Sequence, residues 1–256
     1  MNIANHFSLL FVLLSCVWTH TNARFRIIGG QYINIESSPH TVAIVGNRNY
    51  YYCVGSIVNY HSVLTAAHSV KNEILANLKV LAGVSEIRST FKGEGQRHKV
   101  ENIHYDPDYD PETLFMDIAV VKVITPFDLN SAVKIIPLCD IPAATDSDME
   151  ISGWGGTVIN SDICSPLLKS KIVKIADGQQ CRDPISNTLL SADYAETIMF
   201  AGRSGEGICF GDSGAGGVVN GKLCAVAQGG FEEPDYPDLY TNITNPKVRE
   251  FITRWM

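Results

Sequence analysis

The sequence predicts an all-β globular fold that ends in one helix. Short apolar runs of strand length recur along the 256 residues, and glycine, proline, asparagine and aspartate stand between them. This spacing is typical of β-sandwiches and barrels. No long amphipathic helices alternate with the runs, which argues against a βαβ architecture. The expected strands include residues 41–45, 56–59, 78–82, 118–123, 172–175, 217–219 and 223–227.

The helix is expected at the C-terminal end of the chain. Asn245 followed by Pro246 is typical of an N-cap and a first helical position. The apolar residues that follow at helical spacing are Val248, Phe251, Ile252 and Trp255. This pattern predicts a terminal helix whose apolar face packs on the core.

The composition excludes several classes of protein. With 45% hydrophobic and 18% charged residues, the chain is neither disordered, collagen-like nor a coiled coil. A formal charge of −7, from 20 basic and 27 acidic residues, offers no concentrated basic face for a nucleic acid. No basic run flanks an apolar segment, so attachment to a membrane surface is not expected. The length allows one or two domains.

The N-terminal segment resembles a secretion signal. Residues 7–17 form an apolar run, too short for a membrane span of about 20 residues, and Ala23 ends a suitable cleavage site. No Lys or Arg precedes the run, so the alternative is a buried N-terminal core helix. We predict a signal peptide over 1–23 and a secreted, extracellular protein in which disulfides persist. Cys16 leaves with the signal, so six cysteines remain.

Three short motifs carry candidate catalytic residues. His68 ends the strand-like run Leu64-Thr65-Ala66-Ala67-His68, and Asp117 opens the apolar run 118–123. Ser213 lies in the tight turn Gly211-Asp212-Ser213-Gly214, where glycines leave backbone N–H groups unobstructed. Taken singly, each residue is more simply a packing, capping or turn residue. Together they supply a base, an orienting carboxylate and a nucleophile.

The order of motifs resembles that of the trypsin/chymotrypsin family of serine proteases. The matching segments are Arg26-Ile27-Ile28-Gly29-Gly30, Thr65-Ala66-Ala67-His68, Asp117-Ile118-Ala119, Ser152-Gly153-Trp154-Gly155, Gly211-Asp212-Ser213-Gly214 and Leu239-Tyr240-Thr241. They cover nearly the whole chain after residue 26. The resemblance implies two six-stranded antiparallel β-barrels with the active site between them.

The resemblance also implies a role for each residue. His68 is the general base and acid, Asp117 orients it, and Ser213 is the nucleophile. The N–H groups of Gly211 and Ser213 form the oxyanion hole. Residues 24–26 form a short propeptide and 27–256 the peptidase domain. Cleavage after Arg26 frees the amino group of Ile27, which pairs with Asp212, because a buried charge without a partner is unfavourable.

Several positions depart from the family pattern. Ser69 replaces a cysteine that normally bridges to Cys53, and Cys181 and Cys209 lack their usual partners. The sequence does not select a pairing for the six mature cysteines. Gln228 replaces a small hydroxyl residue that usually supports the catalytic aspartate, which puts catalytic efficiency in question.

The specificity pocket differs as well. By analogy, Gly207 occupies the pocket floor, Ile208 narrows it, and Asp238 supplies a carboxylate from the wall, while Gln228-Gly229-Gly230 binds the substrate strand. The alternative is that Asp238 is a solvated loop residue. The placement predicts a mixed preference for basic and large apolar side chains rather than pure trypsin-like selection.

No cofactor or metal is expected. Val84 and Phe91 stand where calcium-binding relatives carry carboxylates, and Glu94 alone is too few ligands for Ca²⁺. Asn242-Ile243-Thr244 is a glycosylation sequon. The expected partners are protein or peptide substrates, an activating protease and protein inhibitors, with no nucleic acid or membrane, and the protein is expected to be a monomer.

Three functions remain open from the sequence alone. The first is a secreted serine endopeptidase made as a zymogen. The second is a weakly active or inactive homologue that acts as a binding or regulatory protein, which Gln228 and the missing bridges favour. The third, an inhibitor or lectin-like β-protein, is disfavoured by the complete set of His68, Asp117 and Ser213.

Overall fold

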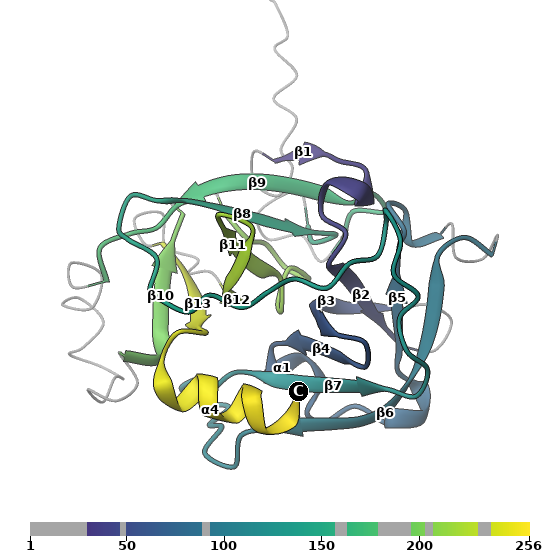
Figure 1. Ribbon diagram of the computed structural model, residues 1–256, viewed down its shortest axis with the longest axis horizontal. Helices are drawn as coiled ribbons and strands as arrows, with labels where there is room; N and C mark the ends of the chain where they lie inside the picture. The colour runs from purple at the N-terminus through teal and green to yellow at the C-terminus, as the bar shows by residue number, and fades with distance from the viewer. Residues whose placement is uncertain are drawn as a thin grey trace, which may run out of the picture.

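The computed structural model describes residues 30–46, 50–88, 93–156, 163–178, 196–202, 207–229 and 237–256. It is mostly β, with a helix at the C-terminal end (Figure 1). The predicted all-β class with a terminal helix is therefore confirmed. Within the described residues, no helix is long and apolar enough to cross a membrane.

The N-terminal half of the chain forms a closed antiparallel barrel in the order β2-β3-β4-β7-β6-β5, at the lower right of Figure 1. Its strands are β2 (Thr41–Val45), β3 (Tyr51–Asn59), β4 (Ser62–Thr65), β5 (Lys79–Ala82), β6 (Gln96–Tyr105) and β7 (Ala119–Val123). Short helices η1 (Ile35–Ser37), α1 (Ala67–Val70) and η3 (Leu75–Asn77) accompany them. The barrel interior is filled by aliphatic side chains such as Val42, Ile44 and Val121.

The C-terminal half forms a second sheet in the order β1-β9-β8-β11-β12-β13-β10. Its strands are β1 (Gln31–Tyr32), β8 (Asp148–Gly153), β9 (Lys169–Lys174), β10 (Ile198–Ala201), β11 (Gly216–Val219), β12 (Lys222–Gly229) and β13 (Asp238–Asn242). An antiparallel bridge between Ile175 and Ala201 brings the end of β9 back to β10. The six strands from β9 to β10 therefore curl towards a second barrel, and β1 is an added edge strand.

Helix α4 (Pro246–Trp255) begins as the sequence predicts. The Asn245 side chain accepts hydrogen bonds from the N–H groups of Lys247 and Val248 at 3.0 and 3.3 Å. Three of the four predicted core residues are buried. The fourth, Trp255, remains 38% exposed, and its ring stacks on His104 with a centroid distance of 3.8 Å.

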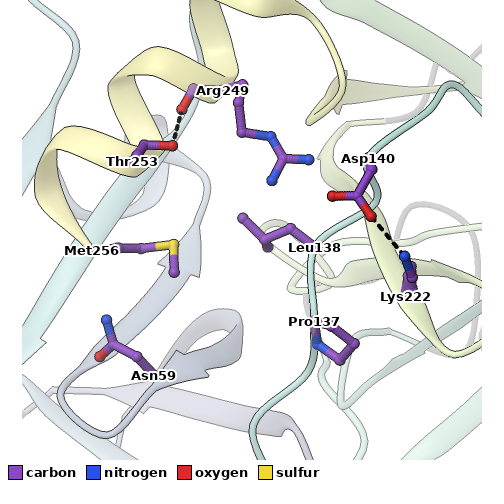
Figure 2. A pocket seen from close by; sticks show the side chains of 8 residues that line it. All are labelled: Asn59, Pro137, Leu138, Asp140, Lys222, Arg249, Thr253 and Met256. Carbon is purple, nitrogen blue, oxygen red and sulfur yellow. Dashed lines mark hydrogen bonds and ion pairs between the residues drawn. The ribbon is translucent and has the colours of Figure 1, made fainter.

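A surface cavity of about 600 Å³ lies between α4, the end of β3 and the segment that connects the two halves. Figure 2 shows the Arg249 guanidinium directed into it above Leu138 and Pro137. None of the residues predicted to form the active site lines this cavity.

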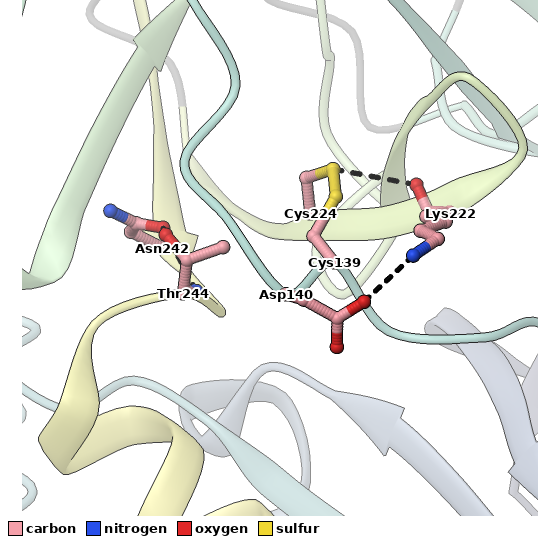
Figure 3. Close-up of a disulfide and its surroundings, with 6 residues drawn as sticks. All are labelled: Cys139, Asp140, Lys222, Cys224, Asn242 and Thr244. Atoms are coloured by element: carbon pink, nitrogen blue, oxygen red, sulfur yellow. Dashed lines mark hydrogen bonds and ion pairs between the residues drawn. A yellow bond between two sulfur atoms is a disulfide. The ribbon is translucent and has the colours of Figure 1, made fainter.

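The connecting segment is attached to the C-terminal half by a disulfide between Cys139 and Cys224 (Figure 3). Beside it, the Lys222 ammonium pairs with the Asp140 carboxylate at 2.7 Å. Backbone hydrogen bonds run in both directions at the same place, from Cys139 N–H to the Leu223 carbonyl and from Leu223 N–H to the Pro137 carbonyl. The segment also bonds to β3, from Ile136 N–H to the Ile57 carbonyl. It is therefore hydrogen-bonded to both halves.

Candidate active site

His68 and Asp117 come together because their strands are neighbours. His68 lies in α1 directly after β4, Asp117 lies just before β7, and Thr65 of β4 pairs with Ala119 of β7. The buried Asp117 carboxylate accepts a hydrogen bond from the His68 backbone N–H at 2.8 Å. Its other oxygen is 2.7 Å from Nδ1 of the His68 ring. Asp117 therefore fixes both the backbone and the ring of His68 and favours the tautomer whose Nε2 can accept a proton.

The backbone of Asp117 is held from the C-terminal half. The Thr241 hydroxyl donates to the Asp117 carbonyl at 2.8 Å, and the Gln228 amide donates to the Thr241 hydroxyl at 2.9 Å. Gln228 thus reaches Asp117 through the Thr241 hydroxyl and the Asp117 backbone carbonyl. The Gln228 Oε1 atom is buried and has no hydrogen-bond partner among the described residues, which is an unfavourable state for a buried acceptor.

The Ser213 turn is attached directly to the N-terminal barrel. Val54 N–H of β3 donates to the Ser213 carbonyl at 2.9 Å. The next residue, Gly214, has φ +82°, and a Cβ there would overlap the Val54 carbonyl and the Thr65 hydroxyl. Only glycine allows this approach. The Ser213 Oγ atom lies 3.5 Å from the Gln228 carbonyl, at the long limit for a hydrogen bond.

Backbone partners set the direction of the two predicted oxyanion donors. The Phe210 carbonyl accepts from Gly156 N–H at 2.7 Å, and the Asp212 carbonyl accepts from Ala215 N–H at 2.9 Å. No peptide bond is cis among the described residues, and a trans peptide directs its C=O and N–H to opposite sides. The N–H groups of Gly211 and Ser213 therefore point away from Gly156 and Ala215.

Asp212 is buried against two glycines. Its carboxylate accepts hydrogen bonds from the N–H groups of Gly155 at 2.8 Å and Cys209 at 3.0 Å, and a Cβ at Gly153 or Gly155 would overlap the carboxyl group. Burial raises the pKa of Asp212 to about 6 despite these donors. The ionised Asp212 carboxylate is therefore less well stabilised here than it would be in water.

Lys169 is a fully buried cation on the same side of the sheet as Asp212. It is the cross-strand partner of Gly153, and directly opposed residues present their side chains to the same face. Because the Asp212 carboxyl group occupies the open face of Gly153, the Lys169 charge lowers the pKa of Asp212 and partly opposes the effect of burial.

Asp238, which the sequence predicts at the pocket wall, lies against Gly207, the predicted pocket floor. It is buried at the start of β13, and its Oδ2 accepts a hydrogen bond from Ile208 N–H at 2.7 Å. A Cβ at Gly207 would overlap the Asp238 carboxyl group, so this carboxyl fills the space that a side chain at 207 would take. Burial, with a smaller contribution from the nearby Asp212, raises its pKa to about 7. Ile208 itself packs into the core of the C-terminal half.

Three of the predicted site residues lie outside the described residues: Arg26, Ile27 and Gly230. The structure brings His68 and Asp117 into direct contact and attaches the Ser213 turn to the same barrel. It also brings Gly207, Ile208 and Asp238 together.

Comparison with known proteins decides the family, because the model of the Trypsin family matches residues 27–252. The chain belongs to the trypsin family. It is 31% identical over 242 residues to a trypsin of Xenopus laevis, covering 91% of this chain and 94% of that protein. It is 28% identical to hypodermin-A of Hypoderma lineatum, covering 89% of this chain and 86% of that protein.

Solved structures share the fold. Neuropsin, a serine protease of mouse brain, matches with a TM-score of 0.77 and 24% identity over 88% of this chain and 98% of its own. The scabies mite inactivated protease paralogue S-D1 matches with a TM-score of 0.77 and 24% identity, over 89% of this chain and 98% of its own. The trypsin-like resemblance and fold are confirmed.

The cysteines depart from the trypsin-family pattern as the sequence indicates. The Cys53 thiol is buried and hydrogen-bonds the side chains of Thr65 and Ser69, and burial raises its pKa to about 12. The described residues contain one disulfide, Cys139–Cys224, which the sequence alone did not select. Cys181 lies outside the described residues. The Cys164 sulfur lies against the backbone of Gly211.

Two further predicted features lie on this trypsin-family fold. The Asn242 side chain accepts from both the N–H and the hydroxyl of Thr244, at 3.0 and 2.7 Å (Figure 3), in a turn that ends β13. In the segment compared with the calcium loop, Val84 is buried in the core, and residues 89–92 are not described. Among the described residues, no three His, Cys, Asp or Glu side chains gather as metal ligands.

Sequence reasoning missed three residues that hold the site together. Tyr51 donates a hydrogen bond to the Gly211 carbonyl, Gly156 fixes the neighbouring peptide, and Thr241 supports Asp117. Thr241 was part of a matching motif, but nothing in the motif identifies the acceptor of its hydroxyl. Tyr51 stands in a run of three tyrosines that reads simply as an aromatic strand.

Proposed function

We propose that this trypsin-family protein is a secreted serine endopeptidase, made as a zymogen, that hydrolyses peptide bonds through an acyl-enzyme. The observation that carries the proposal is that His68, oriented by the buried Asp117, belongs to the barrel to which the Ser213 turn is bonded through Val54, and that the peptides of this turn are fixed by hydrogen bonds. A base, an orienting carboxylate, a hydroxyl and two N–H donors are the groups that acyl transfer requires.

The chemistry follows from these groups. His68 Nε2 takes the proton of the Ser213 hydroxyl as its oxygen attacks the peptide carbonyl, and Asp117 stabilises the resulting imidazolium. The N–H groups of Gly211 and Ser213 stabilise the oxyanion of the tetrahedral intermediate. His68 then gives the proton to the leaving amine, and water repeats the sequence on the acyl-enzyme.

Activation is proposed to occur by cleavage between Arg26 and Ile27, after removal of residues 1–23 as a signal peptide. The new ammonium of Ile27 would pair with Asp212, whose pKa of about 6 reflects a buried carboxylate that lacks full compensation. Pairing would favour the charged carboxylate and stabilise the loop that carries Gly211 and Ser213. An arginine at the cleavage site implies an activating protease that cleaves after basic residues.

The proposed specificity rests on Asp238. Its carboxyl group beneath Gly207 gives the pocket a negative charge when it is ionised, which attracts Lys and Arg side chains. Because burial raises its pKa to about 7, the charge is incomplete at neutral pH. A mixed preference for basic and large apolar side chains is therefore expected.

The proposal is tested by labelling with a fluorophosphonate after cleavage at Arg26. Ser213 should become covalently labelled, and Ser213→Ala should abolish labelling while the thermal midpoint stays unchanged. Folded, correctly cleaved protein that resists the label would instead support a binding protein that uses the protease fold.

The activation step is tested separately with Arg26→Gln. The uncleaved variant should fold but react with the fluorophosphonate at least about 100-fold more slowly, as when an oxyanion donor is lost. Wild-type reactivity in a chain shown by N-terminal sequencing to be uncleaved would disprove the switch between Ile27 and Asp212.

One observation favours a second candidate, a weakly active or inactive homologue with a binding or regulatory role. Gln228 supports Asp117 only indirectly, through the Thr241 hydroxyl and the Leu114 carbonyl, and leaves a buried Oε1 atom without a partner among the described residues. The similar fold of an inactivated mite paralogue is compatible with this candidate. The fluorophosphonate measurement separates the two, because the binding protein needs no reactive Ser213.

A further inference from the structure

Tyr51 connects the N-terminal barrel to the oxyanion loop of the C-terminal half. It is the first residue of β3, and its hydroxyl donates to the Gly211 carbonyl at 2.6 Å. The ring edge also lies against Gly211, 3.0 Å from the position of a Cβ at that residue. The Trp154 ring supports the tyrosine in an edge-to-face contact with a centroid distance of 6.4 Å.

The hydrogen bond from Tyr51 falls on a peptide whose two neighbours have their carbonyls bonded to backbone N–H groups. The preceding carbonyl, of Phe210, bonds to Gly156 N–H, and the following carbonyl, of Asp212, bonds to Ala215 N–H. Between them, the peptide that joins Gly211 to Asp212 is held at both ends: its N–H donates to the Cys209 carbonyl at 2.9 Å, and its carbonyl accepts from the Tyr51 hydroxyl. Rotation of this middle peptide would turn both neighbouring peptides, which carry the N–H groups of Gly211 and Ser213.

Gly211 is the residue where such a rotation is easiest. Its φ of +89° is a conformation that glycine adopts without strain, and glycine also has access to many alternatives. The conformation is therefore not selected by Gly211 itself, and contacts must favour it: the bond from Asp212 N–H to the Cys209 carbonyl within the loop, and a contact from outside the loop. A short hydrogen bond from a phenol held in a packed strand supplies that contact.

We propose that Tyr51 is a positioning residue for the oxyanion hole: its hydroxyl holds the Gly211 carbonyl so that the N–H groups of Gly211 and Ser213 converge on the substrate oxygen. The inference rests on the proposed function, since it concerns the same site. It adds that the barrel carrying His68 and Asp117 also sets the geometry of the oxyanion donors in the other half.

The phenol remains a donor over the whole working pH range. Burial and the nearby Asp212 carboxylate raise the pKa of Tyr51 well above its usual value of about 10. The effect of Tyr51 is therefore independent of pH between about 5 and 9, which separates it from effects that depend on Asp212 or Asp238.

The test compares Tyr51→Phe with Tyr52→Phe in cleaved enzyme. Both remove one hydroxyl from a half-buried ring of β3, but the Tyr52 ring contacts Gly46 instead of the oxyanion loop. Tyr51→Phe should lower the second-order rate constant for fluorophosphonate labelling of Ser213 by about 10-fold or more, equally at pH 6 and pH 8. It should lower kcat for a cleaved peptide without raising KM, since the ground state does not use the oxyanion donors.

The control should stay within about two-fold of wild type, and both variants should keep a thermal midpoint near that of the wild type. A Tyr51→Phe rate constant within two-fold of wild type overturns the inference and leaves the proposed function intact. Wild-type protein that is not labelled at all contradicts the proposed function instead.

A second measurement tests the role of Tyr51 even if the wild-type protein is not labelled. Hydrogen–deuterium exchange is compared between Ser213→Ala and the double variant that also carries Tyr51→Phe. Peptides covering residues 208–214 should exchange at least about 5-fold faster in the double variant, with barrel peptides unchanged. Equal exchange in the two proteins would show that Tyr51 does not hold the loop.

Discussion

The two halves of this protein handle buried charge in different ways. In the N-terminal barrel, the Asp117 carboxylate is buried, but it has a backbone N–H and an imidazole as direct partners. In the C-terminal half, Asp212 and Asp238 are also buried, and their pKa values are raised to about 6 and about 7. Ser213, the proposed nucleophile, therefore lies in the half whose buried carboxylates have raised pKa values.

This difference indicates how control of activity is divided. The acid–base pair is assembled by strand pairing within one barrel, so it is expected to persist before and after cleavage. The oxyanion loop surrounds a carboxylate whose charge is favoured by an additional cation, so its order is expected to respond to the Ile27 ammonium. Lys169 supplies part of that compensation from inside the chain.

The largest effect is expected from Gly155→Ala in the C-terminal half. A Cβ at this position overlaps the Asp212 carboxyl group, so Asp212 must move and the adjacent donors move with it. Fluorophosphonate labelling of Ser213 should fall by more than about 100-fold, equivalent to about 3 kcal/mol.

The matched control is Gly55→Ala in β3 of the barrel, where a Cβ would contact Val63 and the Leu64 carbonyl. It should lower the free energy of unfolding, yet leave the labelling rate within about three-fold of wild type. If the two variants lose activity equally, the proposed division between the halves is wrong.

A disulfide introduced into the barrel should change stability without changing catalysis. Cys53 hydrogen-bonds Ser69, so Ser69→Cys would place two thiols together. The bond should raise the free energy of unfolding by about 3 kcal/mol for a loop of this length. Urea unfolding with and without reductant measures the gain, and the double variant Ser69→Cys, Cys53→Ala should show none. A labelling rate that changes more than two-fold would indicate that the barrel does not hold His68 independently.

The uncleaved protein should lose stability as Asp212 ionises. Its folded pKa of about 6 exceeds the unfolded value of 3.8, so the folded state binds more protons in this window and stability falls as pH rises through it. Between pH 4.5 and 7, Arg26→Gln should lose about 2 kcal/mol more than Arg26→Gln combined with Asp212→Asn. Urea titrations at both pH values measure the free energy of unfolding of the two variants. If both variants lose the same amount between these pH values, the pKa of Asp212 is not raised in the uncleaved protein.

The smallest of these effects concerns specificity. Asp238→Ser should reduce cleavage after Lys and Arg by about 10-fold, about 1.4 kcal/mol, and should spare cleavage after large apolar residues. In the parent enzyme, cleavage after Lys and Arg should rise with pH through about 7 as Asp238 ionises. A peptide library read at pH 6 and pH 8 gives both results. Equal loss of cleavage after both classes of residue, or no loss, would show that Asp238 does not line the specificity pocket.

The sequence predicted the fold well where burial is regular. The run 41–45 is fully buried and forms β2 as expected, and Asn245 caps α4. Strand β6 was missed because most of its side chains are polar and not fully buried. Within this strand only His98 and Val100 are buried. Strand β9 begins earlier than expected because Lys169 is buried rather than exposed.

The candidate site also contains residues that the sequence could predict and residues that it could not. Motif order predicted His68, Asp117 and Ser213 as catalytic residues, since each belongs to a recognisable local pattern. Tyr51 and Thr241 could not be assigned, because their acceptors are backbone carbonyls more than 100 residues away along the chain. Side-chain type alone does not identify such an acceptor, whereas the paired strands do.

The Cys139–Cys224 disulfide is placed so that the two halves stay linked if the main chain between them is cleaved. The segment that follows Cys139 includes Ile141, which is 76% exposed, and is a suitable place for another protease to cut. A cut there severs the main chain between the halves, but Cys139 stays with the first fragment and Cys224 with the second. The two fragments therefore remain covalently joined, and they separate only under reducing conditions.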